Sequence, residues 1–156
     1  MAERITDLIT ENDVLVPLQS TTKEEVLAEL TAFLAKRLGR EDLVESIVAG
    51  VWEREREIST GIGRGIAIPH AEIDEEIPPS AVLGISPGGA EFEALDSQPV
   101  HIVFLLICSK SNQEVRLGVL SSLSHLFGER AVRQALRKAT TPSEVIQIIE
   151  ESEGKD

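Results

Sequence analysis

The apolar run at residues 102–107 constrains the fold of this chain more than any other feature. It reads Ile-Val-Phe-Leu-Leu-Ile and holds no polar residue. It is far shorter than the roughly 18–20 apolar residues that a membrane span needs. A strand that is apolar on both faces belongs in the interior of a sheet whose two sides are covered. The run therefore predicts the central strand of a sheet packed between layers of helices.

Further strands are expected on the same grounds, from short apolar runs bounded by turn residues. The tetrapeptide Ser86-Pro87-Gly88-Gly89 has the composition of a turn and is expected to separate one of these strands from the central one. The shorter strands are expected at residues 14–16, 66–68 and 81–85.

Helices are expected between these strands, because apolar residues recur there at helical spacing. Thr21 with Glu24 forms a predicted capping box, and Gly39 fits the position after the last turn of the same helix. Thr141, followed by Pro142 and Glu144, predicts the start of a last helix. Helices are expected near residues 5–9, 24–38, 42–57 and from 113 to the end of the chain.

Alternation of strands and helices predicts an α/β layered fold. The chain has 156 residues, the length of one ordinary domain. We expect one domain over residues 1–156, with its core at about residues 4–150.

Charge and cysteine content exclude several classes of function. The formal net charge is −12, which disfavours binding to nucleic acid or to an anionic membrane. The single cysteine, Cys108, cannot form an intramolecular disulfide and is expected to be a small buried hydrophobe. The first residues lack the basic and apolar segments of a signal peptide, so a soluble cytoplasmic protein is expected.

The glycine-rich segment at residues 61–65 does not match a nucleotide-binding motif. It reads G-x-G-x-G, with a helix expected before it and a strand after it, whereas the dinucleotide fingerprint is G-x-G-x-x-G between a strand and a helix. No Gly-Lys-Ser/Thr follows, so it is not a P-loop. His70, His101 and His125 show no metal-ligand spacing. We therefore expect neither a cofactor nor a metal.

His70 is the main candidate for chemistry. It follows Pro69 at the end of an expected strand, where an imidazole enters a loop facing a shallow cleft. Arg54, Arg56 and Arg64 lie shortly before it, and Ser59-Thr60 add hydroxyl groups. A neutral imidazole is a nucleophile toward phosphorus, and phosphoryl transfer needs cations or N–H donors around the oxygens. Residue chemistry alone leaves two alternatives open, a phosphate-handling histidine and a structural or surface histidine.

A longer motif resembles a known family. Glu53-Arg54-Glu55, followed by residues 59–70, closely resembles the phosphorylation motif of fructose/mannitol-type enzyme IIA domains of the phosphotransferase system, including the nitrogen-regulatory enzyme IIA. The similarity continues through residues 99–106 and the leucine-rich segment 117–127. It implies a mixed sheet of about five strands flanked by helices, and no cofactor.

The resemblance also implies roles for individual residues. His70 matches the histidine that is phosphorylated through Nε2, with the phosphohistidine of the carrier HPr as donor. HPr is in turn charged by enzyme I from phosphoenolpyruvate. Arg54 matches an arginine beside that histidine that helps to hold the phosphoryl group, and Thr60 is a further candidate phosphate contact.

One position departs from the family pattern. A second histidine is usual near the start of the helix after the central strand, and here that position is Arg116. Arginine is always cationic and offers planar donors for phosphate, but it does not accept a proton. His101 and His125 do not fit that position and are expected to be a strand-edge and a helix-surface histidine.

Acidic residues at positions 72 and 74–76 follow His70 closely. They would repel a phosphoryl group within a few ångströms, so they are expected at the rim, pointing away from the imidazole. A solvated loop is the simplest interpretation of this run, and contact with a basic carrier protein is the alternative.

Three functions remain open on the sequence. The first is a regulatory phosphoryl acceptor of the nitrogen type, favoured because no sugar-binding, enzyme IIB or membrane segment is fused to the domain. The second is an enzyme IIA that passes phosphate to an enzyme IIB of a fructose- or mannitol-like permease. The third is a binding module without transfer chemistry, suggested by Arg116.

Overall fold

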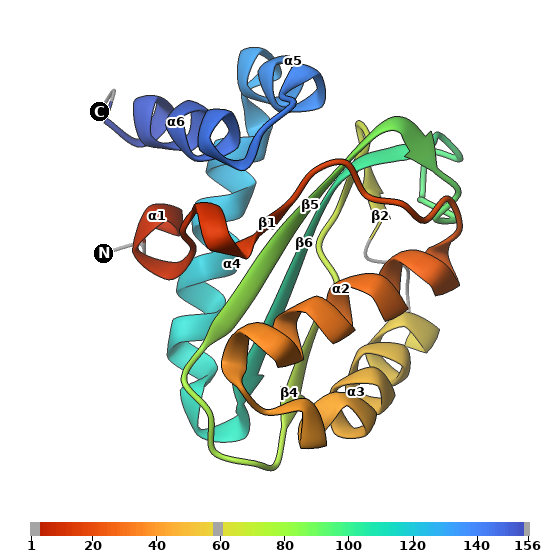
Figure 1. Ribbon diagram of the computed structural model, residues 1–156, viewed down its shortest axis with the longest axis vertical. Helices are drawn as coiled ribbons and strands as arrows, with labels where there is room; N and C mark the ends of the chain where they lie inside the picture. Colours follow the sequence, from red (N-terminus) through yellow and green to blue (C-terminus); the bar gives the residue numbers. More distant parts are fainter. Residues whose placement is uncertain (1–3, 58–60, 155–156) are drawn as a thin grey trace.

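The sheet at the centre of the molecule is mixed and is five positions wide. The computed structural model describes residues 4–57 and 61–154. The strand order is β1-β5-β6-β3-β2, and β4 pairs with β6 beyond β3, so β3 and β4 share one position along the same edge (Figure 1). The strands are β1 (Val14–Leu15), β2 (Gly61–Gly63), β3 (Ile66–Ala67), β4 (His70–Ile73), β5 (Ser80–Ala90) and β6 (Val100–Ser109).

Strand β6 is the central strand, as its apolar sequence predicts. Every residue from Val100 to Ser109 is buried. Strand β5 pairs with β6 in antiparallel fashion, whereas β3 and β4 pair with it in parallel. The parallel register sets His70 opposite Leu106, near the carboxyl end of β6.

Helices cover both faces of the sheet, which confirms the predicted α/β layered class. One face is covered by α2 and α3, and the other by α1, α4 and α6, with α5 beside them (Figure 1). The helices are α1 (Ile5–Leu8), α2 (Lys23–Leu38), α3 (Val44–Glu57), α4 (Gln113–Gly128), α5 (Arg130–Lys138) and α6 (Pro142–Glu153). Among the described residues, none of these helices is long and apolar enough to cross a membrane.

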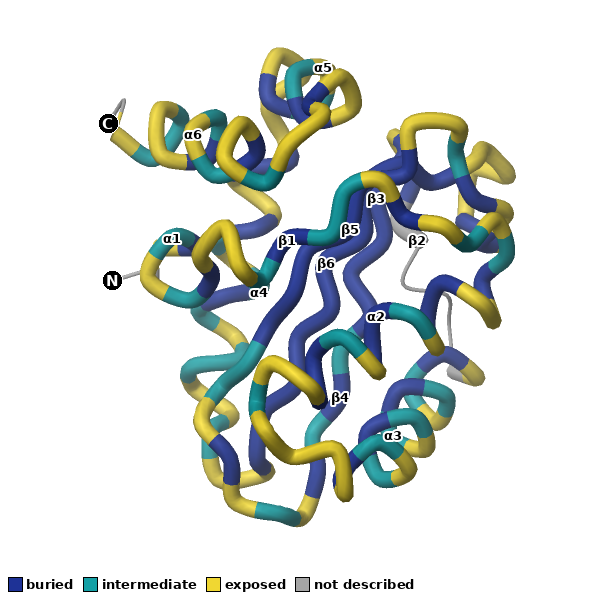
Figure 2. The backbone as a smooth tube through the Cα atoms, in the orientation of Figure 1, coloured by how far each residue is buried: buried dark blue, intermediate teal, exposed yellow. Residues whose placement is uncertain are grey.

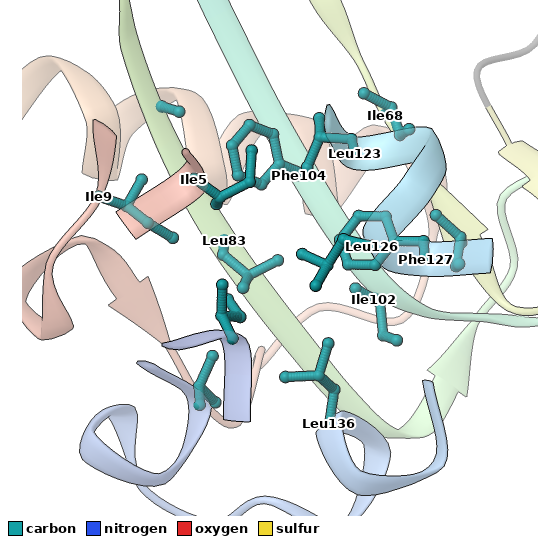
Figure 3. Packing of buried hydrophobic residues seen from close by; sticks show 14 of the residues in the cluster. Ile5, Ile9, Ile68, Leu83, Ile102, Phe104, Leu123, Leu126, Phe127 and Leu136 are labelled. Atoms are coloured by element: carbon teal, nitrogen blue, oxygen red, sulfur yellow. The ribbon is translucent and has the colours of Figure 1, made fainter. Parts of the chain in front are cut away.

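Alternate residues of β6 serve two separate cores, as the period of two along a strand requires. Phe104 and Leu106 pack with α4 and α6, where Phe104 lies among Ile5, Leu123 and Leu83 (Figure 3). The neighbours of Phe104 along the strand pack under α2 and α3. The backbone of the sheet is accordingly buried along its whole centre (Figure 2).

Capping residues near the helix ends were predicted correctly from the sequence, except that the cap of α2 was placed one residue too early. The cap of α2 is Thr22, not Thr21, because the Thr22 side chain accepts the backbone N–H of Glu25 at 3.3 Å. Gly39 ends α2 with a left-handed φ of 67°, as predicted. Thr141 caps α6 and accepts the N–H of Glu144, also as predicted.

Two predictions about strands were wrong. Residues 86–89 do not form a separating turn, since β5 continues through them to Ala90 with an irregular register after Ile85. His70 does not close the strand at 66–68, because that strand ends at Ala67 and His70 opens β4. The imidazole is therefore held by a paired strand rather than by a loop.

Candidate functional site

An open cleft of about 480 Å³ lies where α3, β4 and the start of α4 meet. His70 at the start of β4, Arg54 of α3 and Arg116 of α4 all line it. In the chain, Arg54 lies before β2 and Arg116 lies after β6. Pairing of β4 with the end of β6 brings the two arginines together. The cleft therefore combines one imidazole with two guanidinium groups.

The imidazole of His70 is fixed in one tautomer by the backbone. Its Nδ1 lies 2.8 Å from the carbonyl oxygen of Ile68. A carbonyl oxygen only accepts, so Nδ1 carries the proton and donates, which leaves the lone pair on Nε2. This is the form in which Nε2 acts as a nucleophile.

The electrostatic surroundings keep His70 neutral. Burial lowers the pKa of His70, and the nearby charges of Arg54 and Arg116 lower it further. The hydrogen bond to Ile68 and the carboxylate of Glu55 oppose this shift without reversing it. The ring is therefore uncharged near neutral pH, the state that attack on phosphorus requires.

Arg116 occupies the first turn of α4, and one of its side-chain N–H donors makes no hydrogen bond in the described structure. Its side chain is 18% exposed, and its Nε is buried without a hydrogen-bond partner in the described structure. The nearest carboxylate oxygen, Oε2 of Glu72, lies 3.6 Å away. A buried unsatisfied N–H is costly unless a ligand satisfies it. An anion bound in the cleft would satisfy this donor.

The acidic run after His70 is closer to the cleft than the sequence suggested. Glu72, Asp74 and Glu75 all line it, so they are not confined to a rim that points away. Two of them have partners: Asp74 forms an ion pair with Nζ of Lys110 at 2.7 Å, and Glu75 accepts a hydrogen bond from the hydroxyl of Ser46 at 2.9 Å. Lys110 and Ser46 were not identified from the sequence, because only the tertiary fold brings them to the cleft.

The remaining predicted residues lie elsewhere. Thr60, the candidate phosphate contact, falls outside the described residues. Arg56 is exposed, and Arg64 lines a different cleft at the opposite end of β6. His125 is exposed on α4 as expected, but His101 is buried at the start of the central strand rather than at a strand edge. In the described part of the chain, no three His, Cys, Asp or Glu side chains are placed to hold a metal ion.

A buried ion pair supports the helix that carries Arg54. Nζ of Lys23 lies 2.7 Å from Oε2 of Glu55, and the two side chains are 8% and 1% exposed. Lys23 also lies over the rings of Phe92 and Trp52. The pair joins α2 to the last turns of α3 beside the cleft. This pair could not be predicted from the sequence, since the two residues are far apart along the chain.

Cys108 has no part in this chemistry. It is fully buried in the core under α4. Burial raises the pKa of its thiol to about 11, so it stays protonated at neutral pH. The expectation of a small buried hydrophobe is confirmed.

Comparison with known proteins identifies the family to which this chain belongs. Residues 7–152 match the family described as "Phosphoenolpyruvate-dependent sugar phosphotransferase system, EIIA 2". The chain belongs to this family, and it is thus a phosphotransfer component of the phosphotransferase system type.

Individual relatives carry two kinds of name. The chain is 35% identical over 146 residues to the PTS system fructose-specific EIIABC component of Bacillus subtilis, a match that covers 94% of this chain but only 23% of that protein. It is 32% identical over 147 residues to the nitrogen regulatory protein of Pseudomonas aeruginosa, with 94% of each chain covered.

A solved structure agrees on the fold. The crystal structure of the nitrogen regulatory protein IIA-Ntr from Neisseria meningitidis superposes with a TM-score of 0.82 at 23% identity. The match covers 94% of this chain and 99% of that one. At this identity the likeness concerns the fold alone. The expected mixed sheet flanked by helices is confirmed.

Proposed function

We propose that this protein accepts a phosphoryl group on Nε2 of His70 from an HPr-type carrier and acts as a regulatory, nitrogen-type enzyme IIA. The observation that carries the proposal is the hydrogen bond from Nδ1 of His70 to Ile68, which leaves Nε2 unprotonated in a cleft with two arginines. Membership of the enzyme IIA family supports the same chemistry.

The transfer needs no proton movement at His70. The Nε2 lone pair forms a P–N bond while the P–N bond to the donor imidazole breaks, and the donor leaves as a neutral ring. Nδ1 keeps its proton throughout, bonded to the carbonyl of Ile68. The product ring is cationic and the phosphoryl group anionic, so the arginines act on the oxygens rather than on the ring.

Arg54 and Arg116 supply the positive charge in this scheme. Both line the cleft with His70, and Nε of Arg116 is buried and unsatisfied. A guanidinium holds phosphate oxygens through two parallel N–H donors, which a point charge does not do. Arg116 therefore replaces the second histidine of the family as an electrostatic contact, not as a proton acceptor.

A second candidate function is transport. The relative from Bacillus subtilis is named a fructose-specific component, and its identity to this chain is as high as that of the nitrogen regulatory protein. In that role the phosphoryl group of His70 would pass to an enzyme IIB of a fructose- or mannitol-like permease. The regulatory role instead requires that phosphorylation change the binding of a protein target.

Reconstitution tests the proposal. The purified chain is incubated with phosphoenolpyruvate, enzyme I and HPr, and its mass is measured. We expect one added, acid-labile phosphoryl group on the wild type and on His125→Ala, an exposed-histidine control, and none on His70→Ala. No incorporation into the wild type beside a competent carrier would contradict phosphoryl acceptance and favour a binding module.

Chasing the phosphorylated protein with a fructose-type enzyme IIB separates the two roles. Persistence of the phosphoryl group on His70 supports the regulatory role. Rapid transfer to enzyme IIB contradicts it and supports transport.

A further inference from the structure

A second cleft, lined by arginines, lies at the end of the sheet away from His70. It has a volume of about 410 Å³, within the range of small-molecule sites. Its lining residues come from the start of β6 and from α5, whereas His70 pairs near the end of β6. Its cationic residues are Arg64, Arg130, Arg133 and Arg137.

Three of these arginines share one face of a single helix. Arg130, Arg133 and Arg137 follow the i, i+3, i+7 spacing along α5, and Arg64 reaches the cleft from the turn between β2 and β3. Like charges four residues apart, as at positions 133 and 137, weaken a helix. The pairing of Arg133 with Arg137 therefore does not stabilise the helix.

The guanidinium groups have neutral partners rather than carboxylates. Nη1 of Arg133 donates to the carbonyl oxygen of Phe127 at 2.7 Å, and Nη2 of Arg137 donates to Nε2 of His101 at 3.0 Å. In the part of the chain that the structure describes, none of the four guanidinium groups has a carboxylate oxygen within 4.0 Å. Their positive charge is left uncompensated.

Asp96 carries the one carboxylate among the described residues that line this cleft, and that carboxylate is already engaged. Asp96 accepts the backbone N–H of Arg64 at 2.9 Å and that of Gln98 at 3.1 Å. These two bonds lower the pKa of Asp96, so it is ionised at neutral pH. Four guanidinium groups still outnumber the single carboxylate.

His101 orients Arg137 through a hydrogen bond. Its Nδ1 donates to the carbonyl of Ser86 at 2.9 Å, so Nε2 is the acceptor for Arg137. The ring is buried, and a Cβ at Gly89 would lie 3.0 Å from its Cε1. Gly89 has a φ of 85°, so glycine serves here both for the backbone and for close approach of the imidazole. A neutral buried histidine thus orients an arginine without cancelling its charge.

We propose that this cleft binds a small polyanion, a molecule with at least two phosphate or carboxylate groups. Several guanidinium groups converging on a cavity of this size fit two anionic groups through bidentate hydrogen bonds. The chain as a whole carries a formal charge of −12, so this local concentration of arginine is not a general property of its surface. The site is separate from the His70 cleft and does not depend on phosphorylation.

Titration calorimetry with inorganic pyrophosphate and with citrate tests the proposal on the full, unphosphorylated chain. The test variant is Arg64→Gln/Arg130→Gln, because neither guanidinium makes a hydrogen bond to another described residue, so we expect the fold to be retained. We expect the wild type to bind at least one probe and the double variant to bind it about tenfold or more weakly. Preference for pyrophosphate or citrate distinguishes a phosphorylated from a carboxylic ligand.

Two controls locate the binding. Arg40→Gln removes an exposed arginine that lines neither cleft, and its affinity should equal that of the wild type. His70→Ala/Arg116→Gln disables the first cleft and should leave binding intact. Absence of binding by both probes, equal affinity of the Arg64/Arg130 variant, or loss of binding in the His70/Arg116 variant would each overturn the proposal.

Discussion

Arg116 lies beside Glu72 in the cleft of His70, with 3.6 Å between Nε of the arginine and Oε2 of the glutamate, yet that Nε makes no hydrogen bond to any described residue. The carboxylate offsets part of the arginine's charge, and the donor stays available. The pair therefore combines partial charge balance with an N–H donor that has no partner among the described residues.

Removal of the Glu72 carboxylate should favour the phosphorylated state. Charges a few ångströms apart in a solvent-exposed cleft interact by about 1 kcal/mol or more, so Glu72→Gln should shift the phosphoryl equilibrium with HPr toward this protein by about fivefold or more. Quantifying both phosphoproteins at equilibrium measures the shift. Glu76→Gln, which removes an exposed carboxylate outside the cleft, is the control and should change nothing. An equal effect of both variants would mean that overall charge, not Glu72, is responsible.

Loss of either cleft arginine should slow phosphorylation. Each guanidinium is expected to contact oxygens whose charge changes in the transition state, so Arg54→Gln and Arg116→Gln should each lower the rate about 10–100-fold. Rapid-quench measurement of the phosphoprotein gives the rate, and thermal unfolding checks the fold. The control is Arg56→Gln on the same helix, whose exposed side chain does not line the cleft. A wild-type rate in either cleft variant removes that arginine from the site.

The titration of His70 should respond to its neighbours. Burial, Arg54 and Arg116 hold the pKa of His70 below its ordinary value of 6.5. Arg116→Gln removes one cation, so the pKa should rise toward 6.5, and an NMR titration of the imidazole carbon-bound protons measures it. A pKa unchanged or lowered by this substitution would show that Arg116 does not act on the ring.

The same shift affects stability. The unfolded chain protonates this histidine at about pH 6.5, whereas the folded protein protonates it only at lower pH. Between those two values the unfolded state binds more protons, so the free energy of unfolding falls as the pH drops through this window. Urea denaturation of His70→Ala should lack this component of the pH dependence.

Lys23 should matter to stability far more than a surface lysine does. Lys23→Met leaves the Glu55 carboxylate buried without its 2.7 Å ion-pair partner, and breaking a buried pair in this way costs about 3–5 kcal/mol. Lys110 is the matched control, since it also lies 2.7 Å from a carboxylate but both side chains are largely exposed. Urea denaturation should show a large loss for Lys23→Met and no measurable change for Lys110→Met. Similar losses in both variants would contradict the account.

Features set by local interactions were predictable from the sequence, and those set by tertiary contact were not. Gly39 and Thr141 end or begin helices through bonds within a few residues, so their roles follow from residue type. Continuation of β5 through Ser86-Pro87-Gly88-Gly89 depends on the partner strand, which residue type does not reveal. His70 was a fair candidate from its chemistry, but its tautomer depends on the backbone of Ile68.

The other site residues could not be predicted because tertiary packing brings them together from distant parts of the chain. Arg116 was located only through the family resemblance, because its approach to His70 requires the pairing of β4 with β6. The arginines of α5 have visible helical spacing, but their neutral partners, His101 and the Phe127 carbonyl, come from other elements. Lys23 and Glu55 meet only when α2 packs on α3.

The most direct test of the central claim is the position of the phosphoryl group on the ring. After phosphorylation by phosphoenolpyruvate, enzyme I and HPr, long-range proton–nitrogen NMR correlation of the imidazoles identifies the modified nitrogen. The hydrogen bond from Nδ1 to Ile68 predicts phosphate on Nε2 of His70, with Nδ1 still protonated. Phosphate on Nδ1, or on any other residue, would contradict the account.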